Sequence, residues 1–201
     1  MEKSVIIHCD NIRLEGMLNN NSSTRAVVVT HPHPLYGGNM DNPVVGQIIQ
    51  SFCDKGFTTL RFNFRGTAGS SGMFDNGIGE QDDVRAALEY VKESGFSGLW
   101  LAGYSFGARM NASVIGSGYG ITDHIMVSPP MGFMSFEDVA SMPSTGLILT
   151  GANDEIAPPD MILAAINRWQ IQPRFEVIDG CDHFYTGQLD KLGMVFSDYL
   201  V

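Results

Sequence analysis

The pentapeptide Gly103-Tyr104-Ser105-Phe106-Gly107 decides the fold class, because of what lies on either side of it. Residues 98–102 form a short apolar run typical of a strand, and residues 108–115 are small and apolar, as in a helix. A serine on such a strand-to-helix turn projects its hydroxyl above the sheet edge, and the glycines remove Cβ atoms that would clash there. The N–H of the next residue then faces the space in which an oxyanion would form.

The G-x-S-x-G pattern alone also fits a purely structural role for Ser105. Serine is favoured at the N-cap of a helix, where its side chain accepts a hydrogen bond from the backbone. The chain contains 23 glycines, so the pattern can arise by chance. The rest of the sequence has to decide between a nucleophile and a helix cap.

The composition is that of one globular domain spanning residues 1–201. Hydrophobic residues make up 44% of the chain and charged residues 17%, which is typical of a folded chain with a substantial core. The formal net charge of −10 argues against nucleic acid and anionic membranes as partners, because both favour clusters of lysine and arginine. We expect a small-molecule partner and a monomer or homodimer.

The cysteines and the N-terminal residues favour a cytoplasmic protein. Cys9, Cys53 and Cys181 are odd in number and widely spaced, so they predict neither a disulfide framework nor a metal cluster. No apolar run approaches the roughly 20 residues that span a bilayer. The first residues also lack the apolar core of a signal peptide.

Strand-like and helix-like segments alternate along the chain, which predicts an α/β fold. A hairpin is expected at residues 4–8 and 12–18, further strands at 26–30, 57–63, 98–102, 123–128, 146–151 and 174–178, and helices at 43–54, 79–94, 108–115, 160–169 and 189–201. The expected architecture is a mostly parallel, doubly wound sheet with helices on both faces. The least regular segment, residues 129–142, is too short for a lid domain.

Three residues suited to nucleophilic catalysis follow predicted strands. Ser105, Asp154 and His183 each lie just beyond the end of one. Because ligands bind beyond the carboxyl ends of the strands in an open α/β sheet, we expect these side chains to meet. His183 would take the proton of Ser105, and Asp154 would orient the imidazole and stabilise its cation.

Each of these residues also suits a structural role. Asp154 could be a turn residue or, with Glu155, a helix cap, and His183 could bond a backbone carbonyl. Asp179 and Asp182 are nearer to His183 in sequence and are better placed to shape its turn than to orient its ring. The order Ser, Asp, His at three strand ends nevertheless favours a catalytic set over three coincidences.

The loop at residues 31–38, His-Pro-His-Pro-Leu-Tyr-Gly-Gly, is expected to supply a second oxyanion donor. Its prolines have no N–H, so Leu35 is the first choice of donor and Tyr36 the second. His33 is expected to brace the loop. His31 and His33 resemble a metal-binding pair, but no third ligand follows at a typical spacing, so no metal is expected.

Other suggestive residues receive structural interpretations. Residues 66–72 have the composition of a phosphate loop without its lysine, and we expect these small residues to let the loop pass near the active site. Cys181 lies close to His183 but lacks an elbow, which favours a buried structural thiol. Arg65 and Arg109 are expected to form salt bridges rather than to bind an anionic substrate.

The chain resembles the α/β-hydrolase superfamily over nearly its whole length, and more narrowly the small lidless serine hydrolases related to dienelactone hydrolase. The resemblance rests on the loop at 31–38, on Arg-Phe-Asn-Phe-Arg-Gly at 61–66, and on the elbow and the Asp-His pair. It implies a triad of the serine, aspartate and histidine named above, with an oxyanion hole formed by Phe106 and a residue near Leu35. Dienelactone hydrolases carry cysteine at the elbow, and the serine here departs from them.

These features favour a serine hydrolase that cleaves a small to medium carboxylic ester or thioester through an acyl-enzyme, without a cofactor. A peptidase or amidase could use the same triad, and a non-catalytic scaffold that binds a small ligand is the third possibility. The pocket is expected to be shallow and walled by large apolar residues: Tyr36, Met73, Phe74, Met131, Phe133 and Met134. His33 and Tyr104 are further candidates to line it.

Overall fold

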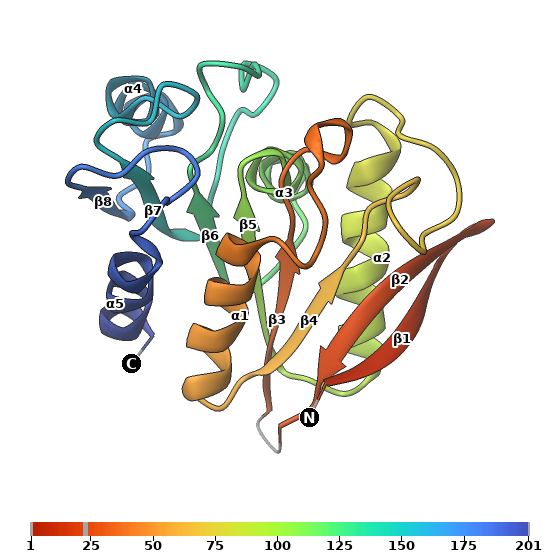
Figure 1. Ribbon diagram of the computed structural model, residues 1–201. Coiled ribbons are helices and arrows are strands. Elements are labelled where there is room, and N and C mark those ends of the chain that lie inside the picture. The colour runs from red at the N-terminus through yellow and green to blue at the C-terminus, as the bar shows by residue number, and fades with distance from the viewer. Residues whose placement is uncertain (1, 22–23, 201) are drawn as a thin grey trace.

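The computed structural model describes residues 2–21 and 24–200 and is built around one eight-stranded sheet (Figure 1). The strands are β1 Glu2–Cys9, β2 Ile12–Asn19, β3 Arg25–Thr30, β4 Thr58–Phe62, β5 Gly98–Tyr104, β6 Asp123–Val127, β7 Thr145–Gly151 and β8 Arg174–Ile178. Their order in space is β1-β2-β4-β3-β5-β6-β7-β8. The pairs β1–β2 and β2–β4 are antiparallel and the other neighbours are parallel, so the mostly parallel sheet is confirmed.

Five α-helices in the described part of the chain cover both faces of the sheet (Figure 1). They are α1 Pro43–Asp54, α2 Gly79–Glu93, α3 Phe106–Gly116, α4 Pro159–Trp169 and α5 Leu189–Tyr199. Helices α1 and α5 pack on one face, and α2, α3 and α4 pack on the other. None of the described helices is both long enough and apolar enough to cross a membrane.

Alternating side chains of the central strands belong to two separate hydrophobic cores, one on each face of the sheet. In β3, Ala26 and Val28 face α2, α3 and α4, whereas Val27 and Val29 face α1 and α5. All four side chains are fully buried. A continuous β-branched run therefore forms a strand covered on both faces, as expected for a parallel sheet.

Most predicted elements form where the sequence places them, with shifts of a few residues at their ends. Helix α1 keeps its predicted bounds because Asn42 Oδ1 accepts a hydrogen bond from the Val44 N–H and Pro43 occupies the first helical position. Within the 31–38 loop, Pro34 begins a short 3₁₀ helix at Pro34–Tyr36. The predicted last helix ends at Tyr199, and its final residue, 201, lies outside the described residues.

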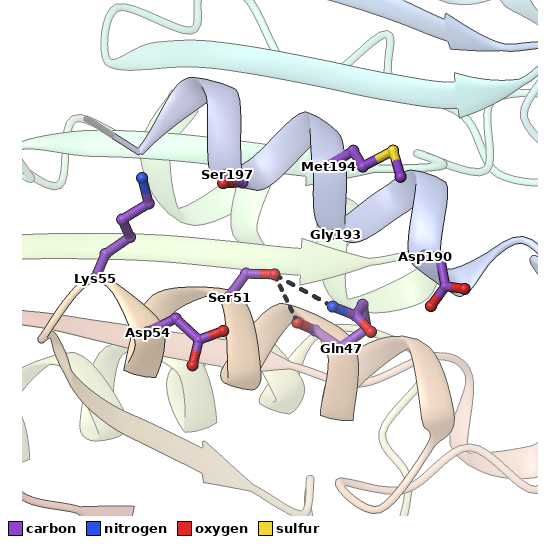
Figure 2. A pocket seen from close by; sticks show the side chains of 8 residues that line it. All are labelled: Gln47, Ser51, Asp54, Lys55, Asp190, Gly193, Met194 and Ser197. Atoms are coloured by element: carbon purple, nitrogen blue, oxygen red, sulfur yellow. Dashed lines mark hydrogen bonds between the residues drawn. The ribbon is translucent and has the colours of Figure 1, made fainter.

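Helices α1 and α5 approach each other closely beside a polar groove of about 280 Å³ (Figure 2). A Cβ atom at Gly193 of α5 would lie 2.6 Å from Gln47 Nε2 of α1, so the glycine allows this approach. The groove is lined by Gln47, Ser51, Asp54, Lys55, Asp190, Gly193, Met194 and Ser197. Seven of these residues belong to α1 and α5, and Lys55 directly follows α1. None of them lies in a loop that follows a strand, so the groove is separate from the site described next.

Candidate active site

Ser105 occupies the sharp turn between β5 and α3. Its backbone has φ 53° and ψ −118°, a strained conformation for a residue with a side chain. A Cβ atom at Gly107 would lie 2.6 Å from the Thr30 carbonyl oxygen, and one at Gly103 would lie 2.7 Å from the Ala108 nitrogen. The two glycines are therefore required by the close packing of β3, β5 and α3, as the sequence predicts.

The side chain of Ser105 does not cap the helix. Ser105 stands at the N-cap position of α3, yet its hydroxyl makes no capping hydrogen bond. Its Oγ lies instead 2.9 Å from His183 Nε2. The geometry decides against the capping role that the pentapeptide alone left open.

The structure brings the three predicted residues into one hydrogen-bonded chain. His183 Nδ1 lies 2.9 Å from both Oδ1 and Oδ2 of Asp154, and all three side chains are buried. A carboxylate only accepts, so the imidazole proton is on Nδ1 and Nε2 is left as an acceptor toward Ser105. The serine hydroxyl is thus placed to give its proton to the ring.

The Asp154 carboxylate is held as an anion despite its burial. Desolvation alone would raise its pKa, but the hydrogen bonds and charge of His183 and the backbone N–H of Ala157 outweigh desolvation, so the pKa is lowered. Asp154 Oδ1 accepts from the N–H groups of Ile156, at 3.0 Å, and Ala157, at 2.7 Å. Asp154 is therefore both a turn residue and the partner of His183.

The two nearby aspartates do not compete for the imidazole. Asp182 Oδ1 accepts from the N–H groups of Phe184 and Thr186, so this side chain shapes the turn that carries His183. Asp179 contributes its backbone carbonyl, which accepts from Lys191 Nζ. The prediction that these residues shape the turn holds for Asp182.

The predicted second oxyanion donor, Leu35, must be corrected. The Leu35 N–H donates to His33 Nδ1 at 3.2 Å, and the Tyr36 N–H donates to the His33 carbonyl at 3.1 Å. The 3₁₀ turn therefore engages both candidate donors, and the Leu35 side chain does not line the pocket. Within residues 2–21 and 24–200, the backbone N–H groups of His33 and Phe106 have no hydrogen-bond acceptor.

The imidazole rings of the two histidines in the 31–38 loop make structural contacts. His31 Nδ1 donates to the Pro32 carbonyl at 2.7 Å and Nε2 accepts from the Phe64 N–H at 3.0 Å, which fixes a neutral ring. Burial lowers the pKa of His31 to about 4. The His33 ring braces the loop, 4.7 Å from the Phe106 ring and 4.9 Å from the Tyr36 ring. No group of three potential metal ligands occurs among the described residues.

A pocket of about 610 Å³ opens beside Ser105. It is lined by Pro32, His33, Tyr36, Gly37, Gly38, Asn42, Tyr104, Ser105, Phe106, Pro130, Phe133, Met134, Ile156, His183 and Phe184. The predicted lining residues His33, Tyr36, Tyr104, Phe133 and Met134 are all present in this set. None of the described lining residues is a lysine, arginine, aspartate or glutamate.

Three residues predicted to wall the pocket do not reach it. Met131 is buried in the core, Met73 is exposed to solvent, and Phe74 packs against the rings of His33 and Phe106 without lining the pocket. Phe184 was not predicted, although its position directly after His183 is a signal that could have identified it.

The loop at residues 66–72 does not line the pocket, contrary to our expectation. It packs on β2, where Ser71 Oγ accepts from the Arg13 N–H and Ser70 Oγ accepts from the Glu15 N–H. Its small residues therefore allow a close approach to a strand. The small residues do permit close packing, as the sequence indicates, but the segment that they pack against is β2.

The remaining side chains take the structural roles predicted for them. Arg65 pairs with Asp83 and Arg109 with Asp138, each at 2.7 Å. Cys181 is fully buried, and this burial raises the pKa of its thiol to about 11, so it is a poor nucleophile.

Comparison with known proteins places this architecture in a family. A serine hydrolase homologue from Coxiella burnetii is 32% identical and superposes with a TM-score of 0.92 over 99% of this chain and 97% of that chain. A serine hydrolase without a lid from Xanthomonas campestris is 29% identical, with a TM-score of 0.90 over 98% and 92% of the two chains. An uncharacterised protein of Rickettsia prowazekii is 35% identical over 94% of this chain and 84% of that protein.

The chain belongs to the α/β-hydrolase superfamily. It shares its architecture with the solved serine hydrolase without a lid. A scan against protein-family models found no match.

Proposed function

We propose that the protein is a serine hydrolase that cleaves an uncharged carboxylic ester through an acyl-enzyme. The observation that carries this proposal is the hydrogen-bonded chain from Ser105 Oγ through His183 to Asp154, at the mouth of an apolar pocket. A serine becomes a strong nucleophile when a correctly oriented base accepts its proton.

The reaction proceeds in two halves. Ser105 Oγ attacks the ester carbonyl carbon while its proton passes to His183 Nε2, and Asp154 stabilises the imidazolium. The tetrahedral intermediate collapses, and the departing alcohol takes the proton from Nε2. A water molecule then gives a proton to the same nitrogen and attacks the acyl carbon, which releases the acid and restores the serine hydroxyl.

The oxyanion is assigned to the backbone N–H groups of Phe106 and His33. Phe106 is the first residue of α3, so its N–H is unused by the helix and carries the positive end of the helix dipole. His33 belongs to the loop that follows β3, and its N–H is likewise unengaged within the described chain. Donors fixed in advance stabilise the charge that develops in the transition state.

The lining of the pocket favours a neutral ester over a thioester of a phosphate-bearing carrier. Anionic substrates need arginine or lysine to replace the water that they lose. No such side chain lines the pocket among the described residues, and the protein has a formal net charge of −10. A pocket of about 610 Å³ suits a small or medium acyl group.

The test is hydrolysis of p-nitrophenyl esters, from acetate to octanoate, by the wild type and Ser105→Ala in parallel. We expect turnover by the wild type that is lost in the variant, together with labelling of Ser105 by a fluorophosphonate. Absence of both turnover and labelling in the wild type would contradict the proposal and favour a ligand-binding scaffold. Labelling with cleavage of matched anilides but not of esters would favour an amidase.

A further inference from the structure

Exposed aromatic side chains gather at one place on this protein. The chain contains 12 phenylalanines, 6 tyrosines and 2 tryptophans, and all of them lie within the described residues. Of these, only Tyr36, Phe133 and Phe184 are exposed, with exposed fractions of 74%, 58% and 66%, and all three line the pocket beside Ser105. The other exposed large apolar side chains of the described chain are aliphatic, and none of them lines this pocket. Apolar surface that is concentrated and open to water marks a site that another molecule covers.

The three exposed rings come from three different loops. Tyr36 ends the 3₁₀ helix after β3, Phe133 lies in the segment between β6 and β7, and Phe184 lies between β8 and α5. The Tyr36 and Phe133 rings meet edge to face, with centroids 6.0 Å apart and planes at 72°. The Phe184 ring meets the His183 ring in the same way, at 5.6 Å and 88°. The fold therefore brings these rings to one pocket from distant parts of the chain.

The lining of the pocket is aromatic rather than aliphatic. Five of its fifteen residues are phenylalanine or tyrosine, whereas phenylalanine, tyrosine and tryptophan together make up 10% of the chain. Apart from two prolines, the only aliphatic side chains among the described lining residues are those of Met134 and Ile156. A saturated group would bury apolar area against this wall, but an aromatic ring also gains the directional attraction between ring edges and ring faces. The lining therefore favours an aromatic occupant.

A cationic occupant is disfavoured by the same lining. Aromatic rings also attract cations, but a cation that leaves water for a pocket needs an anionic or polar partner to replace its hydration. No aspartate or glutamate is among the described residues that line this pocket. An uncharged aromatic ring needs no such partner.

We propose that Tyr36, Phe133 and Phe184 bind an aromatic ring of the substrate. This inference rests on the proposed function and deepens it, because it makes the substrate an ester with an aryl group on its acyl or its alcohol side. The bound ring adds edge-to-face contacts and covers surface that is otherwise open to water. Contacts with a group remote from the reacting carbonyl are made in the bound substrate and in the transition state alike, so they act mainly on KM.

Two matched pairs of esters test this proposal and distinguish the two sides of the ester. Methyl phenylacetate and methyl cyclohexylacetate carry the ring on the acyl side, and benzyl acetate and cyclohexylmethyl acetate carry it on the alcohol side. The saturated ring has the larger apolar surface, so burial of area alone would favour the saturated ester. We expect the wild type to show a kcat/KM about tenfold higher for the aromatic ester of one pair, mainly through a lower KM. Equal or reversed kcat/KM values within both pairs would overturn the proposal.

Substitution of the rings tests which side chains provide the preference. Phe133→Leu and Phe184→Leu keep an apolar side chain and remove the ring, so each should lower the ratio of aromatic to saturated kcat/KM, and the double variant should bring it close to one. The ratio compares two esters on the same protein, so a general loss of activity from a change beside His183 cancels. Met73→Leu is the control, because Met73 is 82% exposed and does not line the pocket, and it should keep the wild-type ratio. An aromatic preference that persists in the double variant would contradict the assignment.

A binding measurement separates this inference from the proposed function. Ser105→Ala cannot form an acyl-enzyme, so ligand-observed NMR can compare its affinities for the two esters of each pair without turnover. Tighter binding of an aromatic ester, lost when Phe133→Leu and Phe184→Leu are added, supports the inference even if the wild type neither hydrolyses esters nor reacts with a fluorophosphonate, a result that fails the proposed function alone. Rings that instead cover a second copy of this chain would give a wild-type dimer that Phe133→Leu dissociates, with equal affinities within both pairs. That result would overturn the inference.

Discussion

Gly151 and Cys181 are in direct backbone contact: a Cβ atom at Gly151 would lie 2.6 Å from the carbonyl carbon of Cys181. The Cys181 carbonyl also accepts a hydrogen bond from the Asn153 N–H at 2.9 Å. These contacts join the loop that carries Asp154 to the loop that carries His183. The distance between carboxylate and imidazole is thus set by the main chain as well as by the side chains.

Gly151→Ala should therefore damage both stability and activity. The new methyl group would force the two loops apart, because the atoms that it meets belong to the backbone and cannot swing away. We expect a lower melting temperature and a kcat/KM at least tenfold lower. Gly46→Ala is the matched control, since a Cβ there meets nothing within 4 Å and lies inside α1. That variant should be neutral or more stable by up to about 1 kcal/mol; equal effects of the two substitutions would contradict the argument.

Asp154→Asn should lower kcat by about 10³–10⁴-fold with the fold intact, as expected when a triad loses the acceptor that fixes its tautomer. An amide can present its NH₂ group to His183 Nδ1. The ring then carries its proton on Nε2, which can no longer accept the proton of Ser105. Asp182→Asn is the control, because Asp182 accepts only backbone N–H groups in the turn. Steady-state kinetics of the two variants would show which aspartate orients His183. A larger loss of kcat in Asp182→Asn than in Asp154→Asn would assign that role to Asp182.

The oxyanion assignment can be tested at His33. Its φ of −57° lies in the range that proline adopts, so His33→Pro removes the N–H and keeps this φ. His33→Ala removes the same ring and keeps the N–H. We expect kcat of the proline variant to be about 10²–10³-fold below that of the alanine variant, the usual effect of losing one oxyanion donor. Equal kcat values in the two variants would place the second donor elsewhere.

Stability should decline in mild acid because two buried histidines resist protonation. Burial lowers the pKa of His31 to about 4 and that of His124 to about 3, both below the ordinary value of 6.5. The unfolded chain therefore binds protons first as the pH falls below 6.5. Stability is fully present above that pH and declines toward pH 4, by about 1.4 kcal/mol per pH unit for each histidine.

His124→Gln should remove the contribution of one of these two histidines to the pH dependence of stability. Glutamine does not titrate and can keep the contact with Thr145 Oγ1, which lies 3.0 Å from His124 Nδ1. Urea unfolding from pH 7 to pH 4.5 would measure the slope of stability against pH. A slope unchanged from that of the wild type would exclude His124 as a source of the acid sensitivity.

Local signals in the sequence were enough for the helices, the strands and the grouping of the three site residues. Asn42 and Pro43 mark the start of α1 by capping chemistry that needs no tertiary information. Ser105, Asp154 and His183 meet because parallel strands bring their carboxyl ends to one edge. These rules depend only on chain order and residue type.

Contacts between distant loops could not be predicted in this way. The sequence favours Leu35 as the donor, but in the structure its N–H donates to His33 Nδ1, a bond that depends on how the 3₁₀ turn closes. The hydroxyl groups of Ser128 and Tyr185 lie 2.9 Å apart in the structure, yet the two residues are 57 positions apart and carry no shared motif. The exclusion of Met131 from the pocket likewise depends on loop orientation.

The order of strands has a consequence for biosynthesis. From β5 onward each new strand pairs beside the one made just before it, so β6, β7 and β8 extend a single growing edge. Ribosomes deliver the N-terminal part of a chain first. The nucleophile, the acid and the base would thus emerge and dock in that sequence, and a nascent polypeptide would hold an inert serine until β8 and the turn beyond it are in place. Reactivity toward a fluorophosphonate would then report the completion of folding rather than its onset.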